Sequence, residues 1–338
     1  MTGRQKKILK SALSLAGAAV LLYFAFRGVE WSEFAATLGQ CHWGFVLLSM
    51  ACGVSAFFFR AVRWRQMLMP LDPETSLKTT YHAVTIGNIS NFIFQYLGEF
   101  VRCVLVCRHS GCSGKKIRYD QAIGTIALER VLDLFSIVVL FSVLLVCRWN
   151  RFGDFFSDKV LGPLSGISGN TLMWVVAALS VILISSLCVA VLKFRNSNAL
   201  FSKAYDIMKG LADGFMSFMK MRKKVFFLVS TALIWVMYWL QIVFMSSAVP
   251  SFPPFGPADA LFIMLAGSIA SFVPVPGGFG AYHYLVALSL SSLYGISWAS
   301  GIFFATLAHE SQALTMVVTG GISYFAEISQ KNRNTDSE

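Results

Sequence analysis

Ionisable residues inside long apolar runs are the first candidates for chemistry in this chain. Glu129 and Arg130 lie with Asp133 in the middle of the apolar run Ala122 to Cys147. A charge at membrane depth costs about 2.5–3.5 kcal/mol on insertion scales unless it is paired or hydrated. Glu129 and Asp133 are four residues apart and share one helical face, so a cation must balance them. This pattern predicts either an ion network that braces the helix or a site that binds phosphate or exchanges protons.

Two further pairs of polar residues lie in apolar surroundings. Glu99 and Arg102 stand three positions apart on one helical face, close enough to pair. His309 and Glu310 are adjacent within another apolar run. Such a histidine could relay protons, or both side chains could serve only to pack helices together. For each pair a structural role and a functional role stay open.

Glycine and proline predict two breaks in the helices. The stretch 87–102, GNISNFIFQYLGEFVR, recurs 180 positions later as 267–282, GSIASFVPVPGGFGAY, with two glycines, an isoleucine and a phenylalanine in equivalent places. Prolines lack a backbone donor and successive glycines favour turns, so the second stretch cannot continue a regular helix. Helix N-termini that face such a break could bind an anion such as a phosphate. A tight turn without a ligand is the alternative.

Together these patterns define the candidate residues for substrate binding and translocation, with no catalytic residue among them. They are Asn88, Asn91, Glu99, Arg102, Glu129, Arg130, Asp133, Pro274, Pro276, Gly277, Gly278, Gly280, His283, His309 and Glu310.

Two weaker patterns complete the survey of chemistry. Cys103, Cys107, His109 and Cys112 have a loosely metal-like spacing that fits no strong zinc signature, so neither a metal site nor a cofactor is predicted. A basic and aromatic segment predicts anchoring at the membrane interface, or more specifically recognition of lipid headgroups. Its basic residues are Arg60, Arg63 and Arg65.

The composition indicates that helices in a membrane position these residues. The chain has 338 residues, of which 56% are hydrophobic and only 13% are charged, too few charges to cover a soluble surface of that size. Each of six apolar runs is about long enough to cross a hydrocarbon core of roughly 30 Å as a helix. They are Ile8 to Phe26, which is expected to be a retained signal anchor, Trp43 to Phe59, Ala122 to Cys147, Thr171 to Leu192, Val225 to Val249 and Trp298 to Phe325.

The distribution of basic residues predicts the orientation. If the N-terminus is cytoplasmic and the run Thr79 to Leu97 crossed fully, the basic segment after it would lie outside, against the charge bias of membrane proteins. A re-entrant hairpin that enters and returns on the inside removes this conflict, and a second hairpin, Ala258 to Leu293, would enter from the outside. The basic residues left outside are then Arg27, Arg148, Arg151 and Lys159. Both termini are predicted to be cytoplasmic.

We therefore expect an all-α membrane protein with about six transmembrane helices and two oppositely oriented re-entrant hairpins in a single domain, 1–338. The halves 1–150 and 171–330 would form an inverted repeat, a plan in which transporters bind substrate near the midplane. Phe94 stands where the second copy has Pro274, so stretch 87–102 is predicted to be the more helical copy.

Several of these motifs resemble a known family. Arg63 to Arg65, Asn91 with Leu97 to Glu99 and Arg102, Glu129 to Asp133, and Pro274 to Gly280 are similar to the flippase-like family that includes the transmembrane region of lysylphosphatidylglycerol synthases. The resemblance implies a multi-pass protein of the bacterial inner membrane that moves a lipid between leaflets. The resemblance does not extend to the soluble aminoacyl-transfer domain of those enzymes, so their enzymatic activity is not expected. Phe94, Tyr96 and His283 depart from the family pattern.

The expected function is translocation of a phosphate-bearing amphiphile, either a phospholipid derivative or a polyprenyl-phosphate-linked lipid. The alternatives are a secondary transporter of a small solute or ion, and a membrane enzyme that acts on a lipid phosphate. Expected partners are membrane lipids and lipid-synthesising enzymes. The formal net charge of +11 does not predict nucleic-acid binding, because most basic residues lie in loops next to predicted spans.

Overall fold

The computed structural model describes residues 17, 19–94, 96–110, 116–148, 152, 224–250, 252–253, 255–273 and 275–336. Every regular element within these ranges is helical, which confirms the predicted all-helical class. The chain divides into two compact units, one formed by Met1–Ile126 with Arg222–Glu338 and the other by Ala127–Met221. The predicted span Thr171 to Leu192, most of Ile8 to Phe26, and Pro274 lie outside the described residues.

The first unit contains a helical segment over residues 19–26 and then a series of longer helices. Those before the second unit are α2 (Trp31–Gly39), α3 (Trp43–Leu68), α4 (Leu77–Ile93), α5 (Leu97–His109) and the first residues of α6 (Tyr119–Cys147), which continues into the second unit. Those after it are α10 (Lys224–Ala248), α11 (Pro257–Ala270), the single 3-10 turn η3 (Pro276–Gly278), α12 (Ala281–Tyr294) and α13 (Trp298–Asp336).

Local sequence signals account for several of the helix ends. The hydroxyl of Ser76 accepts a hydrogen bond of 3.0 Å from the backbone N–H of Thr79 and so caps the start of α4. Pro257 occupies the first turn of α11, where a missing N–H costs nothing, and the Asp259 carboxylate accepts from the N–H of Gly256 at 3.1 Å. Gly295, in the left-handed conformation, ends α12.

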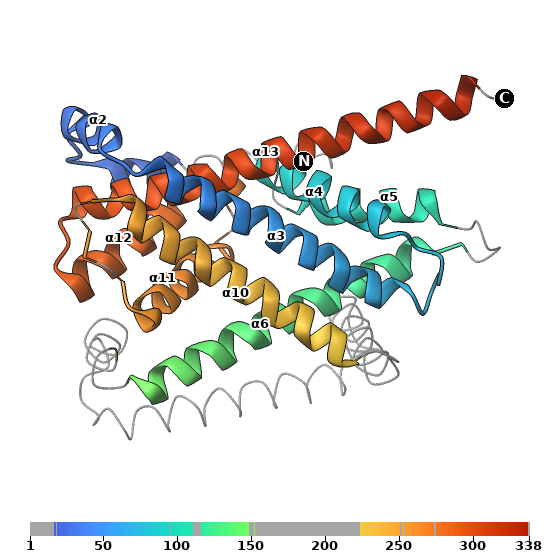
Figure 1. Cartoon of the computed structure of the whole chain (residues 1–338), viewed down its shortest axis with the longest axis horizontal. Coiled ribbons are helices and arrows are strands. Elements are labelled where there is room, and N and C mark those ends of the chain that lie inside the picture. The colour runs from blue at the N-terminus through green and yellow to red at the C-terminus, as the bar shows by residue number, and fades with distance from the viewer. Residues whose placement is uncertain are drawn as a thin grey trace, which may run out of the picture. The chain divides into compact units, whose positions relative to one another are not determined.

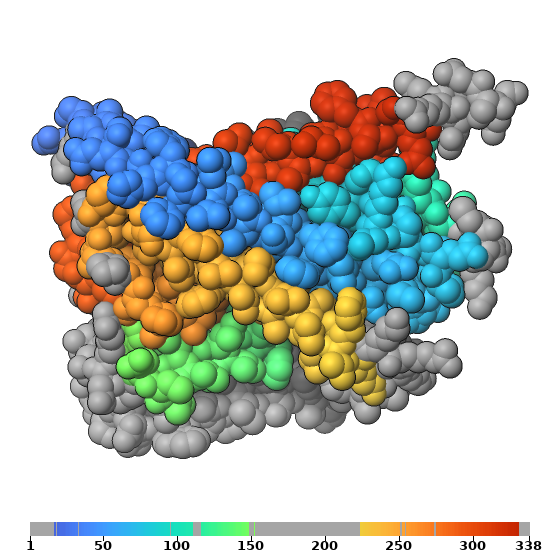
Figure 2. Space-filling view, in the orientation of Figure 1, coloured from blue at the N-terminus to red at the C-terminus, as the bar shows by residue number. Residues whose placement is uncertain are grey.

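Helices α3 and α10 lie side by side in the first unit (Figure 1), and the Ser49 hydroxyl donates across this contact to the carbonyl of Gln241 at 3.1 Å. Figure 2 shows atoms of α3 between those of α10 and those of α4 and α5 on the visible face. Helix α13 packs against both α4 and α12.

Three helices among the described residues, α3, α6 and α10, are long and apolar enough to cross a membrane. They correspond to three of the six predicted runs. The run Trp298 to Phe325 forms part of the continuous 39-residue α13, and His309, Glu310 and Gln312 lower the hydropathy of that stretch.

The helices of the second half begin at nearly constant intervals after those of the first. Helices α3 and α10 begin 181 residues apart, α4 and α11 180, α5 and α12 184, and α6 and α13 179. The weak sequence echo therefore coincides with a repeated order of helices.

Candidate functional site

The first break separates α4 from α5 by only three residues. Tyr96 at its end has a left-handed backbone with φ of 68°, which reverses the chain direction so that α4 and α5 pack against each other. The side-chain oxygen of Asn91 accepts a hydrogen bond of 2.7 Å from the N–H of Gly98. Asn91 thus satisfies one of the unpaired donors at the start of α5.

Gly87 and Gly98 do not lie in this break but inside the two helices, where their backbones touch. A Cβ atom on Gly98 would overlap the carbonyl oxygen of Gly87, and a Cβ on Gly87 would lie 2.6 Å from Cγ of Arg102. Small residues allow this close helix approach, as they do in many membrane helix pairs. The space over Gly87 is filled by the side chain of Arg102.

Arg102 is buried, with 2% of its surface exposed. Its guanidinium carbon lies 4.2 Å from the centre of the Trp64 ring on α3, a cation–π contact. The Trp64 indole N–H donates to the hydroxyl of Thr125 at 3.0 Å, which holds the ring in place. A permanent positive charge is therefore fixed beside the first break.

Two other predicted residues surround this charge on the same helix pair. Glu99 is partly buried in the first turn of α5. Asn88 is buried, and its Nδ2 atom has no hydrogen-bond partner among the described residues. A buried amide donor without a partner costs about 1–3 kcal/mol, so Asn88 is a candidate for contact with a ligand.

The second break is longer and runs from residue 271 to residue 280, with the turn η3 inside it. Gly277, Gly278 and Gly280 have φ angles of 60°, 74° and 79°, a region that residues with a Cβ atom rarely adopt. A Cβ on Gly280 would also lie 2.5 Å from Cβ of Leu21 in the N-terminal helical segment. Comparison of the two breaks confirms that the first copy is the more helical one.

The last turn of α4, directly before the first break, touches the second break within the first unit. The ring of Phe92, in the last turn of α4, lies 5.3 Å from the ring of Phe279, centre to centre. The end of α4 and the second break, which are far apart in the sequence, therefore lie next to each other.

The pair α4–α5 and the pair α11–α12 each contain one close contact between a glycine and a larger side chain, and the two contacts are 180 positions apart. Gly87 makes room for Arg102, and Gly267 makes room for Tyr282, whose Cε2 atom would lie 2.5 Å from a Cβ on that glycine. Both members of the second contact stand 180 positions after their counterparts in the first.

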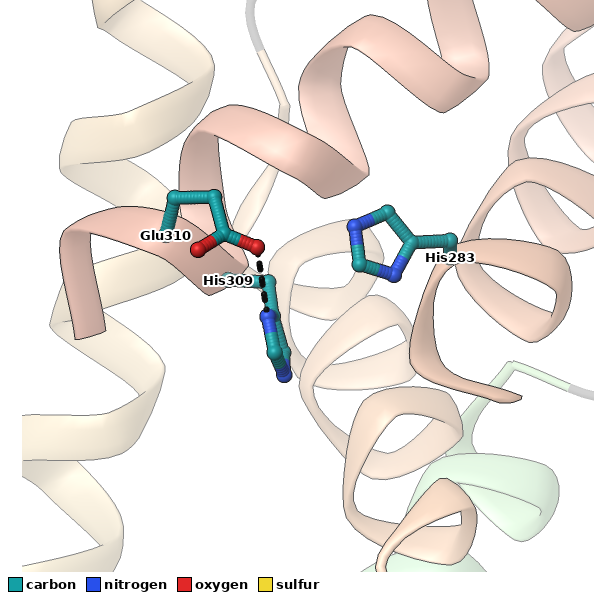
Figure 3. A group of neighbouring side chains, drawn as sticks. All are labelled: His283, His309 and Glu310. Atoms are coloured by element: carbon teal, nitrogen blue, oxygen red, sulfur yellow. Dashed lines mark hydrogen bonds and ion pairs between the residues drawn. The ribbon is translucent and has the colours of Figure 1, made fainter. Parts of the chain in front are cut away.

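A polar cluster adjoins the second break. His309 on α13 lies with Nε2 2.8 Å from the carbonyl oxygen of Gly277 and with Nδ1 3.1 Å from Oε1 of Glu310. His283 on α12 is 1% exposed, and its ring centre is 5.0 Å from that of His309. Figure 3 shows the imidazole of His283 directed toward the Glu310 and His309 side chains. The structure thus brings together three predicted residues that come from two helices.

The remaining predicted residues lie on α6 and α3. Glu129 on α6 is buried, Arg130 is exposed and Asp133 is intermediate; all three belong to the second unit. On α3, Arg63 is fully buried, whereas Arg60 and Arg65 are partly exposed.

A second polar cluster, formed by His82, His109 and Glu327, was not predicted from the sequence. The carboxylate of Glu327 on α13 lies 2.7 Å from Nδ1 of His82 on α4 and 3.1 Å from Nε2 of His109 on α5. The two histidines and the acid come from three helices, so no local spacing could indicate the cluster. The only sequence signal was the presence of polar residues in otherwise apolar helices.

Comparison with known protein families identifies one family that matches most of the chain. The family described as "Lysylphosphatidylglycerol synthase TM region" matches residues 8–320, which agrees with the resemblance seen in the motifs. No curated protein gives a significant match. The match covers most of the chain, and the described helices include ones able to cross a membrane. The chain therefore belongs to the lysylphosphatidylglycerol synthase transmembrane-region family, a family of membrane proteins tied to lipid metabolism or transport.

Proposed function

We propose that this protein moves a phosphate-bearing amphiphile, a phospholipid derivative or a polyprenyl-phosphate-linked lipid, between the leaflets of the bacterial inner membrane without changing it chemically. The observation that carries the proposal is Arg102, a buried cation held against Trp64 beside a break between two helices. An ionisable residue at membrane depth marks a substrate pathway by default. Membership of a lipid-related membrane family directs that expectation to a lipid.

The repeated helix order supports an inverted-repeat transporter plan. Corresponding helices begin about 180 residues apart, and the contacts Gly87–Arg102 and Gly267–Tyr282 share one register. Three crossings in each half would invert the second half relative to the first. In such proteins the substrate binds near the midplane, where interrupted helices meet. The Phe92–Phe279 contact would then lie at that level.

The membrane placement follows from the basic residues. We place both termini in the cytoplasm, the α4–α5 pair as a hairpin entering from that side, and the α11–α12 pair as a hairpin entering from the opposite side. Non-helical backbone at membrane depth is tolerated only where protein or water shields it from lipid, so both breaks would have to lie in such surroundings.

The chemistry of the first break suits a phosphate. The guanidinium group presents donors in a planar fork that matches phosphate oxygens, and it stays charged at any physiological pH. Asn88 supplies an additional buried amide donor. Glu99, in the first turn of the same helix, would balance the positive charge while the substrate is absent.

A groove between α3 and α10 offers a route for the hydrophobic part of the lipid. It has a volume of about 340 Å³ and is lined mainly by apolar side chains, among them Phe58, Phe59 and Phe226. Arg65, in the last turn of α3, also lines it. An apolar groove with a cation in its wall fits an acyl chain that carries a phosphate headgroup.

The test is lipid movement in liposomes that contain the purified protein and a trace of fluorescent phospholipid. A reducing agent that does not cross the bilayer reports how fast the label reaches the outer leaflet. Arg102→Gln should lower the initial rate about tenfold or more, because hydrogen bonds to a charged group contribute about 1.5–3 kcal/mol. Arg102→Lys, which keeps the charge but not the fork, should retain an intermediate rate.

Arg118→Gln is the matched control, because the Arg118 side chain is 74% exposed and pairs with Asp120 at the surface. Thermal unfolding of each variant separates loss of folding from loss of activity. An unchanged rate in Arg102→Gln would overturn the proposal. Chemical alteration of the lipid, seen by mass spectrometry, would indicate an enzyme instead, and gradient-coupled uptake of a water-soluble solute would indicate a secondary transporter.

A further inference from the structure

His283, His309 and Glu310 form a group whose ligand-type atoms all lie within 4.8 Å of one another. Within the described part of the chain it is the only group of three or more His, Cys, Asp or Glu residues arranged this closely. Both histidines are buried, with 1% and 7% of their surface exposed. The proposed lipid pathway leaves this group without an assigned task.

The hydrogen bonding of His309 fixes which nitrogen can act as a ligand. A carbonyl oxygen can only accept, so Nε2 carries the proton and donates to Gly277 at 2.8 Å. In the neutral imidazole, Nδ1 then presents a lone pair, and it lies 3.1 Å from a carboxylate oxygen of Glu310. Two acceptors at this distance need a positive particle between them, either a proton or a metal ion.

This arrangement has the usual support of a metal-binding histidine. Such a histidine nearly always donates its other ring N–H to a backbone carbonyl or a carboxylate, which fixes the tautomer and the ring orientation. Here the carbonyl of Gly277 accepts the hydrogen bond from Nε2 of His309. It is available because the left-handed turn at Gly277 takes the backbone out of helical hydrogen bonding.

His283 provides an independent observation. Its Nδ1 atom is buried and has no hydrogen-bond partner among the described residues. Buried polar groups are nearly always satisfied, so an exception calls for an explanation such as a bound ion. The ring of His283 faces the side chains of His309 and Glu310 (Figure 3). The aromatic rings of Phe26 and Phe279 also contact it.

We propose that His283, His309 and Glu310 bind a divalent transition-metal ion, with Zn²⁺ as the best match. Two imidazole nitrogens and one carboxylate oxygen are a common ligand set for zinc, which takes them at about 2.0–2.2 Å and leaves a fourth position open. Ligand atoms around such an ion are about 3.4 Å apart, so small side-chain rotations close the present spacing. The Glu310 side chain is 47% exposed and provides access for the ion.

The ion would brace the second break. It would join α12, which starts directly after the break, to α13, and its ligand His309 holds the carbonyl of Gly277 inside the break. This proposal does not depend on lipid translocation, because metal binding is measured without any transport assay.

The test uses the purified full-length chain in lipid nanodiscs, stripped of metal with a chelator and titrated with Co²⁺ and Zn²⁺. We expect one Co²⁺ per chain with the visible absorption of a four- or five-coordinate nitrogen and oxygen site, displaced by Zn²⁺. Glu310→Gln removes a direct anionic ligand and should weaken Zn²⁺ binding about 10-fold or more, since even the loss of an outer-shell partner costs that much. This variant keeps a side chain of the same shape at an exposed position, so it should fold. His283→Gln should weaken binding to a similar degree.

His42→Ala is the matched control, since His42 is exposed at the start of α3, and its Zn²⁺ affinity should equal that of the unaltered chain. A second control removes two thiols, Cys103→Ser with Cys107→Ser. Absence of a Co²⁺ band, or equal affinity in Glu310→Gln and the unaltered chain, would overturn the proposal. Loss of binding in the cysteine variant alone would do so as well, because it would place the ion elsewhere.

Discussion

The helix pairs α4–α5 and α11–α12 have the same contact at their crossing but different breaks. In the first pair Gly87 makes room for Arg102, a charged residue; in the second, Gly267 makes room for Tyr282. The first break takes three residues and the second takes ten, with three left-handed glycines. Both pairs therefore have a glycine where their two helices cross. The length of the break and the charge of the side chain packed on that glycine differ between the pairs. In the proposed function the first pair holds an anion through Arg102, whereas the second pair changes direction over a longer turn.

The largest expected effect concerns α6, which follows the first pair as α13 follows the second. Glu129 is 1% exposed and stands 180 positions before His309. Glu129→Ala and Arg130→Ala should each abolish lipid movement in liposomes, because the charge balance along the pathway would be lost, while helix content measured by circular dichroism stays unchanged. Full translocation activity in both variants would show that Glu129 and Arg130 are not needed for lipid movement. The proposed pathway would then rest on the pair α4–α5 alone.

Next in size is Gly280→Ala in the second break. A left-handed backbone costs a residue with a Cβ about 1–2 kcal/mol, and the new methyl group would collide with Leu21. We expect a loss of about 2–5 kcal/mol in unfolding free energy, the sum of this strain and an overpacking cost of about 1–3 kcal/mol. Thermal unfolding in detergent measures it, and Gly295→Ala is the control, because that glycine is left-handed with no atom within 4 Å. Equal losses at both positions would show that only backbone strain matters.

Gly98→Ala compared with Gly267→Ala tests the shared crossing. At Gly98 the new methyl group meets the backbone of Gly87, which cannot move aside, so we expect a loss of about 1–3 kcal/mol. At Gly267 it meets the ring of Tyr282, a side chain that can rotate, and the expected loss is about 1 kcal/mol. Gly124→Ala, with no atom within 4 Å, should not destabilise the chain. A larger loss at Gly267 than at Gly98 would reverse our ranking of the two crossings.

The smallest effect is expected for Asn91→Ala, which removes the acceptor for the Gly98 N–H. Loss of a helix-capping side chain costs about 0.5–2 kcal/mol. Asn91→Asp keeps the acceptor and should unfold at nearly the temperature of the unaltered chain. If both substitutions lower the unfolding temperature equally, the hydrogen bond does not stabilise the first break.

The sequence was sufficient for the helical class, the positions of both breaks and the greater helicity of the first, because these follow from apolar runs, prolines and glycines. It located the first break only within the stretch 87–102, and the structure has Gly87 and Gly98 inside the helices on either side of that break, since glycine serves both turns and close packing. The contact of Arg102 with Trp64 and that of Glu327 with His82 could not be predicted. They join residues far apart in the chain, and no local pattern encodes such pairs.

Helix α13 touches both helix pairs. At about 1.5 Å per residue its 39 residues extend for about 58 Å, well beyond a hydrocarbon core of roughly 30 Å. Its first third contacts the second break through His309, and farther along Gly320 packs against Ile89 of α4 and Glu327 binds His82. One continuous helix therefore contacts the second break at one place and the body of α4 at another. The position of α4 relative to the second break is thus set by a single helix as well as by the direct contact between Phe92 and Phe279.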